Sequence, residues 1–119
     1  MPPPYKALYL SPVIPSYDLP KTRTFFTDLF GFGIFMGDDT YSILHKDNLT
    51  IHLLRAGDIG EMEFYLEVDD IDKLWESIGD KLADIKVRPP FDREYGMREL
   101  HIIVPYTKTL MFVGQVIKP

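Results

Sequence analysis

The order of predicted elements occurs twice along this chain of 119 residues, and this repetition limits its fold more than any other feature. Apolar alternation and helical periodicity predict a strand, a helix and three further strands in each half. The letters of the two halves agree little, but Asp18 and Asp69 hold the same place before each helix. We therefore expect one domain over residues 1–119, with modules at about 7–57 and about 61–117.

In the first module, Asp18 has the position and chemistry of a helix N-cap. Gly31 has those of a residue that ends a helix. The predicted helix extends between them to about Phe30. Turn-forming residues separate the strands that follow it. The strands expected in this module cover residues 7–14, 33–36, 41–45 and 49–55.

In the second module, Asp69 or Asp70 is expected to cap a helix whose apolar residues recur at helical spacing as far as Leu82. Residues 89–96 are polar and rich in turn formers, so they are predicted to be a linker. The strands expected here cover residues 62–68, 85–88, 98–104 and 109–116. Two such modules predict an α+β fold of curled, mostly antiparallel half-sheets, with helices on the convex faces and concave faces free for a ligand.

Composition narrows the possible partners. The net charge of −5 disfavours nucleic acid, because phosphate binding needs a basic surface. The chain has no cysteine, which excludes disulfides, thiolate catalysis and Cys-ligated metal sites. It also has neither an apolar run of membrane-spanning length nor a signal-peptide pattern, so we expect a cytoplasmic protein without a membrane partner.

Three local motifs carry a family resemblance. They are Phe25-Phe26-Thr27-Asp28-Leu29-Phe30-Gly31-Phe32, Glu67-Val68-Asp69-Asp70-Ile71-Asp72-Lys73-Leu74 and Tyr95-Gly96-Met97-Arg98-Glu99-Leu100-His101-Ile102. On these motifs the chain resembles the vicinal oxygen chelate superfamily, in its glyoxalase/bleomycin resistance/dioxygenase branch. The resemblance covers about residues 7–117. It implies paired βαβββ modules and a homodimer whose pockets each lie between the N-terminal module of one chain and the C-terminal module of the other.

The last hairpin departs from the family pattern, which usually has Gly in this turn. Here the turn reads Val104-Pro105-Tyr106-Thr107-Lys108, so no glycine is present to adopt a positive φ. We expect the turn to be built differently.

The resemblance places the superfamily's four metal-ligand positions on Ser11, His52, Glu63 and Met111. A divalent transition metal requires three or four His or carboxylate ligands, and Ser11 and Met111 are poor substitutes. We therefore expect no metal and no cofactor. His52 and Glu63 are open to three interpretations: a hydrogen-bonded pair or one exposed residue, contacts for a ligand, and, least favoured, metal ligands.

Strand alternation places a mixed aromatic, aliphatic and polar set on the concave side. This set comprises Tyr9, Ser11, Val13, His52, Leu54, Glu63, Tyr65, Glu67, Met111 and Val113. We predict that five of them line one ligand cavity, with Arg98 at its wall: Ser11, His52, Glu63, Tyr65 and Met111. Since neighbouring strand residues point to opposite sides, either Arg98 or Glu99 faces inward.

Three functions remain open. The first is binding or sequestering of an amphipathic organic molecule, as in antibiotic resistance by drug binding, and the two poor ligand positions favour it. The second is a metal-dependent lyase, isomerase or dioxygenase of the glyoxalase type. The third is a structural dimer with a vestigial pocket. Catalysis is the less favoured interpretation, since the sequence contains no nucleophile motif or phosphate loop.

Overall fold

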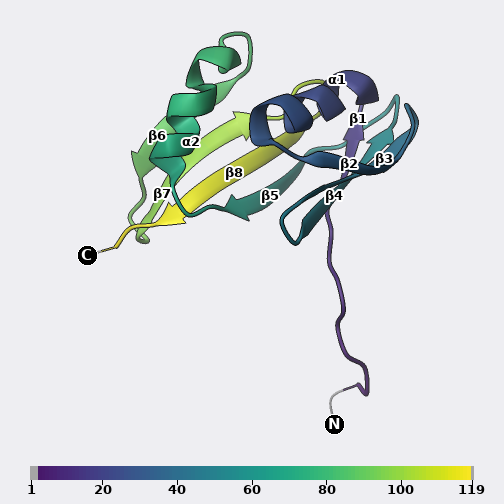
Figure 1. Cartoon of the computed structure of the whole chain (residues 1–119), viewed down its shortest axis with the longest axis horizontal. Helices are drawn as coiled ribbons and strands as arrows, with labels where there is room; N and C mark the ends of the chain where they lie inside the picture. Colours follow the sequence, from purple (N-terminus) through teal and green to yellow (C-terminus); the bar gives the residue numbers. More distant parts are fainter. Residues whose placement is uncertain (1–2, 119) are drawn as a thin grey trace.

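The computed structural model describes residues 3–118 and confirms an α+β fold of two four-stranded mixed sheets. Figure 1 shows the two sheets side by side, with a helix over the same broad side of each. The elements of the first half are β1 (Val13–Ser16), α1 (Leu19–Thr24), β2 (Gly33–Gly37), β3 (Tyr41–Lys46) and β4 (Leu49–Arg55). Those of the second half are β5 (Met62–Glu67), α2 (Ile71–Ile78), β6 (Val87–Asp92), β7 (Met97–Ile103) and β8 (Thr109–Val116).

The two sheets have the same topology. Their strand orders are β1-β4-β3-β2 and β5-β8-β7-β6. In each sheet the first and last strands of the module pair in parallel, and the remaining pairs are antiparallel. The tandem βαβββ arrangement predicted from the sequence is therefore confirmed.

Both helices begin at the aspartates that the sequence suggests. The carboxylates of Asp18 and Asp70 accept hydrogen bonds from the backbone N–H groups of Lys21 and Lys73, at 3.2 and 3.0 Å. Each cap satisfies one backbone donor that the first helical turn leaves unpaired. The first helix continues as a π-helical turn to Leu29, and the second as a 3₁₀ turn to Leu82. Within residues 3–118, no helix is long and apolar enough to cross a membrane.

One apolar core lies between the helices and the sheets and includes residues of both halves. Phe25 and Phe26 of the first helical segment pack edge to face, with ring centroids 5.1 Å apart. The halves are also joined by polar contacts, because the Thr22 hydroxyl donates to the carbonyl oxygen of Pro105 at 2.7 Å. The helices are thus fixed over one face of the sheets, and the opposite faces remain for other contacts.

The first strand is later and shorter than predicted. β1 begins at Val13 instead of residue 7, and the preceding segment extends away from the body of the molecule (Figure 1). In this register the Thr50 carbonyl faces Pro12, which has no N–H, and the Ser11 hydroxyl donates to that carbonyl instead at 2.9 Å. Leu8 and Leu10 in this segment are 86% and 97% exposed.

The predicted linker at 89–96 is in part a strand. β6 extends from Val87 to Asp92 and contains Pro89 and Pro90. Proline has no N–H to donate, but β6 is an edge strand, and its pairing with β7 shifts register between Arg88 and Phe91. The position at the sheet edge therefore overrides the turn signal of the two prolines.

The final hairpin forms its turn without glycine. Tyr106 adopts a left-handed backbone with φ of 64°. The Thr107 hydroxyl donates to the carbonyl oxygen of Val104 at 2.8 Å, and the Tyr17 N–H donates to the carbonyl oxygen of Tyr106 at 2.8 Å. These bonds stabilise a conformation that costs a non-glycine residue about 1 kcal/mol or more.

Candidate functional site

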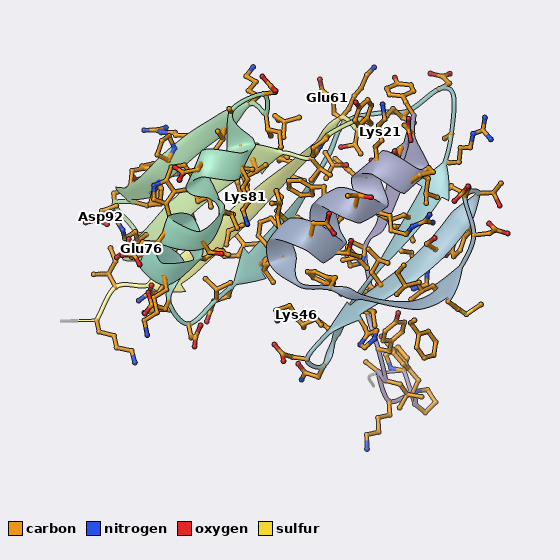
Figure 2. The ribbon with its side chains drawn as sticks, turned by 45° about the horizontal axis from the view of Figure 1, so that its top comes forward. Lys21, Lys46, Glu61, Glu76, Lys81 and Asp92 are labelled. Carbon is orange, nitrogen blue, oxygen red and sulfur yellow. The ribbon has the colours of Figure 1, made fainter. Side chains whose placement is uncertain are left out.

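The candidate site is the face of each sheet that lies opposite its helix. On β5, alternation places Glu63, Tyr65 and Glu67 on this open face, while Met62, Phe64 and Leu66 pack against the core. The figures show the two helices over the other side of both sheets (Figures 1 and 2). Each open face carries its own polar cluster.

The open face of the first sheet is organised around His52. The Tyr9 hydroxyl lies 2.9 Å from His52 Nε2, and the Tyr41 hydroxyl hydrogen-bonds to Nδ1. The Thr50 hydroxyl lies 2.6 Å from the Tyr9 hydroxyl and 2.9 Å from that of Ser11. These residues form a polar network of uncharged hydroxyl groups and one imidazole, and most of its bonds are exposed.

An aromatic row crosses the open face of the second sheet, with one ring from each strand. The rings of Phe91 (β6) and His101 (β7) have centroids 5.1 Å apart, and those of His101 and Phe112 (β8) 4.6 Å apart. Tyr65 (β5) completes the row, with its centroid 6.2 Å from that of Phe112. The strand register aligns them, since His101 is opposite Phe112 and Phe112 is opposite Tyr65. We call these four residues the aromatic row.

The buried carboxylate of Glu99 fixes two rings of this row through hydrogen bonds. It is 1% exposed and accepts hydrogen bonds from four side chains. Two come from the row itself, from Tyr65 at 2.9 Å and from His101 at 2.8 Å. Two come from the β6–β7 loop, from Tyr95 at 2.5 Å and from Arg93 at 3.2 Å. We call Glu99 and these four donors the Glu99 cluster.

The electrostatics of the Glu99 cluster favour an ionised carboxylate and neutral phenols. Burial by itself raises the pKa of Glu99, but the hydrogen bonds from His101, Tyr95 and Tyr65 outweigh it and lower that pKa below its ordinary value. Burial, followed by the bond to Glu99 and its charge, raises the pKa of Tyr65 well above its usual range. The row therefore contains a neutral hydroxyl whose proton is already committed to Glu99.

Tyr65 reaches Glu99 across a glycine. A Cβ atom built on Gly114 would lie 1.9 Å from the Tyr65 hydroxyl. Gly114 is opposite Glu67 on β5 and Glu99 on β7, so it provides the gap through which the phenol reaches the carboxylate. A glycine inside a strand often marks such a close approach, and that signal was available from the sequence.

The predicted site residues are only partly brought together. A cavity of about 620 Å³ between the halves is lined by fifteen residues, among them Ser11, Tyr65 and Met111. Glu63 lies in a separate hollow with Lys86 and Lys108, and His52 bonds to tyrosines of its own half. The interpretation of His52 and Glu63 as a hydrogen-bonded pair is therefore wrong.

Met111 and Arg98 do not lie on the open face of the second sheet, although Met111 lines the cavity between the halves as expected. Met111 is fully buried in the core, where Val113 also lies, and Phe112 takes the open face because it pairs with Tyr65. Arg98 points to the helix side, where it donates to Asp72 of α2 at 3.1 Å. Its neighbour is therefore the residue that faces inward, and the wall contact expected of Arg98 belongs to Glu99.

The sequence analysis also missed residues that form the site. It named His101 and Tyr95 only as part of a family motif, and it did not single out Phe91, Phe112 or Tyr41. The signal for Phe112 was weak, because Met111, Phe112 and Val113 are all apolar and alternation cannot select a face. The aromatic residues at Phe91 and Tyr95 were hidden by the assignment of residues 89–96 to a linker.

The metal positions implied by the resemblance do not fit a metal ion. Both ring nitrogens of His52 are hydrogen-bonded to tyrosines, and Met111 is enclosed in the core. The Ser11 hydroxyl is bonded to Thr50. Over residues 3–118, no three His, Cys, Asp or Glu side chains lie together in a way that would hold a metal.

Comparison with known proteins gives matches at the level of structure. No protein-family profile matches the sequence, and no curated protein sequence matches it. The bleomycin-binding protein of Streptomyces verticillus, solved with copper(II)-bleomycin, has a TM-score of 0.75 at 22% identity, over 97% of this chain and 99% of that one.

Two further solved structures, one of a lyase and one of a resistance protein, are also similar to this chain. Lactoylglutathione lyase from Agrobacterium tumefaciens has a TM-score of 0.75 at 17% identity, over 95% of this chain and 96% of that one. The fosfomycin resistance protein FosX from Mesorhizobium loti has a TM-score of 0.70 at 14% identity, over 93% and 92%. Together with the two βαβββ halves, these matches show that the chain has the fold of the vicinal oxygen chelate superfamily.

Proposed function

We propose that the protein binds and sequesters an amphipathic organic molecule with a planar aromatic part, and that it does so without a metal and without transforming its ligand. The aromatic row is the observation that carries this proposal. Neighbouring rings of the row are tilted or edge-to-face, so a flat molecule would stack on one ring and contact the edges of the next. Sequestration of an antibiotic is the biological role that we favour, as for the bleomycin-binding proteins of the same fold.

The rigidity of the row supports binding. Two of its four members are hydrogen-bonded to one buried carboxylate, so their rings are already ordered before a ligand arrives. A surface ordered in advance loses less conformational entropy on binding. The cavity of about 620 Å³ between the halves has Tyr65 as the one row member in its lining, and its volume is within the size range of sites for small organic molecules.

A homodimer completes the site in this proposal. Several large apolar side chains are exposed in the single chain. They are Leu8 and Leu10 in the N-terminal segment, and Ile34, Phe35 and Met36 on β2. A second copy would cover such surfaces and close the open faces. Light scattering at micromolar concentration should give about twice the chain mass of 13.8 kDa. A mass of one chain would contradict this arrangement.

The binding test uses copper-free bleomycin and a panel of flat amphipathic compounds in a thermal-shift assay. A compound at 100 times its dissociation constant should stabilise the folded protein by about 2.7 kcal/mol. Phe112→Ala should weaken binding by about tenfold or more, since stacked aromatic contacts contribute about 1–3 kcal/mol. Tyr17→Ala, an exposed aromatic outside the row, is the matched control. Equal affinity in both variants would overturn the proposed site.

Metal analysis separates this proposal from a glyoxalase-type enzyme. Protein purified without chelator should hold less than about 0.2 equivalents of zinc, nickel, manganese or iron, because no described cluster offers three suitable ligands. A stoichiometric metal that is lost in His52→Ala would restore the enzyme interpretation. His45→Ala is the control, since His45 is a second histidine on the same sheet.

A further inference from the structure

The five arginines of the chain differ in whether a carboxylate lies close enough to form an ion pair. Arg23, Arg93 and Arg98 each lie within ion-pair distance of a carboxylate. Within residues 3–118, no such carboxylate accompanies Arg55 or Arg88. An arginine without a carboxylate is ordinary on a protein surface, so a further observation is needed to give either one a role.

Arg88 is held in place by the end of the aromatic row. Its guanidinium carbon lies 3.6 Å from the ring centroid of Phe91, which is a close cation–π stacking distance. The strand register places Arg88 opposite His101, so both side chains belong to the open face of the sheet. The stacked guanidinium is therefore ordered beside the row, while its N–H donors have no protein acceptor among the described side chains.

We propose that Arg88 is an anion-binding subsite, and that the sequestered ligand carries a carboxylate or a similar planar anionic group next to its aromatic part. This inference rests on the proposed function and specifies its ligand. A guanidinium presents two parallel N–H donors that match the two oxygens of a carboxylate. An aromatic acid lying along the row would place its carboxylate at Arg88, which covers Phe91, and its ring inward against His101 and Phe112.

The surrounding charges permit this assignment. The nearest buried carboxylate is Glu99, opposite Phe91, and its charge is compensated by Arg93 and by the hydrogen bonds of its cluster. Glu63 and Glu67 lie on β5, three strands away, at roughly 14 Å for the usual strand spacing. Charges at that separation are largely screened at physiological ionic strength.

The position of the subsite also fits a small ligand. β6 is the outer strand of the second sheet, and Asp92 at its end lies at the outer edge of the molecule (Figure 2). The anionic group would therefore bind at the rim of the face, where it keeps part of its hydration. The aromatic part would lie inward over the row.

The test compares two probes with one skeleton, 2-naphthoate and the neutral 2-naphthalenemethanol. Affinities are measured by isotope-edited NMR titration at 150 mM salt, followed through His101 and Phe112. The wild type should bind naphthoate about tenfold more tightly than the alcohol, since a charge-assisted pair of hydrogen bonds distinguishes them. Arg88→Gln should abolish this preference and leave binding of the alcohol unchanged.

Two variants make the result specific. Arg55→Gln removes the other arginine that lacks a carboxylate partner, and it should keep the preference for naphthoate. Arg88→Lys should keep only part of it, because an ammonium lacks the guanidinium fork. Equal binding of both probes by the wild type, or a preference that survives Arg88→Gln, would overturn the anion subsite while leaving the proposed function intact. Binding of neither probe would overturn the row as a site, and the subsite with it.

Discussion

His52 in the first sheet lies between two tyrosine hydroxyls on a largely exposed surface, whereas Glu99 in the second sheet gathers four donors and is almost fully buried. The two sheets have one topology, so the backbone does not explain this difference. The first network consists of hydroxyl groups and an imidazole whose partners water can replace, and it contains no carboxylate. The second is built around a charge that water cannot reach. Stability and site geometry should therefore depend much more on the second network.

Glu99→Gln should give the largest effect and tests this comparison directly. The amide has one acceptor oxygen for the four donors of the Glu99 cluster and removes the charge opposite Arg93. We expect a loss of about 3 kcal/mol in the free energy of unfolding, measured by urea denaturation. His52→Gln, the matched change in the first sheet, should cost about 1 kcal/mol or less. Equal losses would contradict the difference between the sheets.

The pH dependence of the unfolding free energy tests whether the charge of Glu99 stabilises the second network. The pKa of Glu99 is lower in the folded protein than its ordinary value of 4.5. Its contribution is therefore complete above about pH 4.5 and is lost as pH falls through the lower folded value. The difference in unfolding free energy between wild type and Glu99→Gln should be constant from pH 7 to 5 and should shrink below pH 4.5. A difference that grows on acidification would show the opposite sign of linkage.

Gly114→Ala should break one bond of the cluster without removing a charge. The added methyl group would displace the Tyr65 hydroxyl, which passes directly over Gly114. We expect a loss of about 1–2 kcal/mol and a displaced Tyr65 ring, seen as a changed ring chemical shift. Gly57→Ala is the control, since nothing lies within 4 Å of a Cβ at that position. A Gly114→Ala protein with an unchanged Tyr65 signal would contradict the proposed gap.

The hairpin turns of the two halves give the smallest expected difference. Asp47 in the β3–β4 turn has φ of 54°, and Tyr106 in the β7–β8 turn has φ of 64°. Aspartate tolerates this conformation better than tyrosine does. Tyr106→Gly should raise the melting temperature by an amount equivalent to about 0.5 kcal/mol, and Asp47→Gly should change it less. A larger gain at Asp47 would show that the contact between Lys21 and the Tyr106 ring offsets the strain.

Local chemistry explains which parts of the fold are readable from the sequence. Asp18 and Gly31 specify a helix start and stop through their own side-chain or backbone properties, and both predictions are confirmed. The start of β1 and the extent of β6 depend on which neighbours pair with them. Pro89 and Pro90 are compatible with a strand only at an edge, and edge position is a property of the assembled sheet.

The site was less predictable than the fold for a related reason. Tyr65 was found because β5 alternates clearly between apolar and polar residues. Phe112 was missed because β8 is apolar on both faces at its centre, so its register is fixed only by pairing with β5. Whether Arg98 or Glu99 faces inward depends on the position of α2, which provides Asp72 for Arg98. The periodicity of β7 does not show on which side of the sheet that helix packs.

The prolines of β6 also bear on how the protein behaves at high concentration. An open sheet edge is a template on which further chains can add as strands, and such addition is how amyloid-like fibres grow. Pro89 and Pro90 are adjacent and lack N–H groups, so this edge is short of a donor, and the register shift beside them makes it irregular. Pro15 similarly interrupts the β1 edge of the other sheet. The chain can therefore leave an aromatic face open for a ligand while resisting fibrillar growth from these two margins.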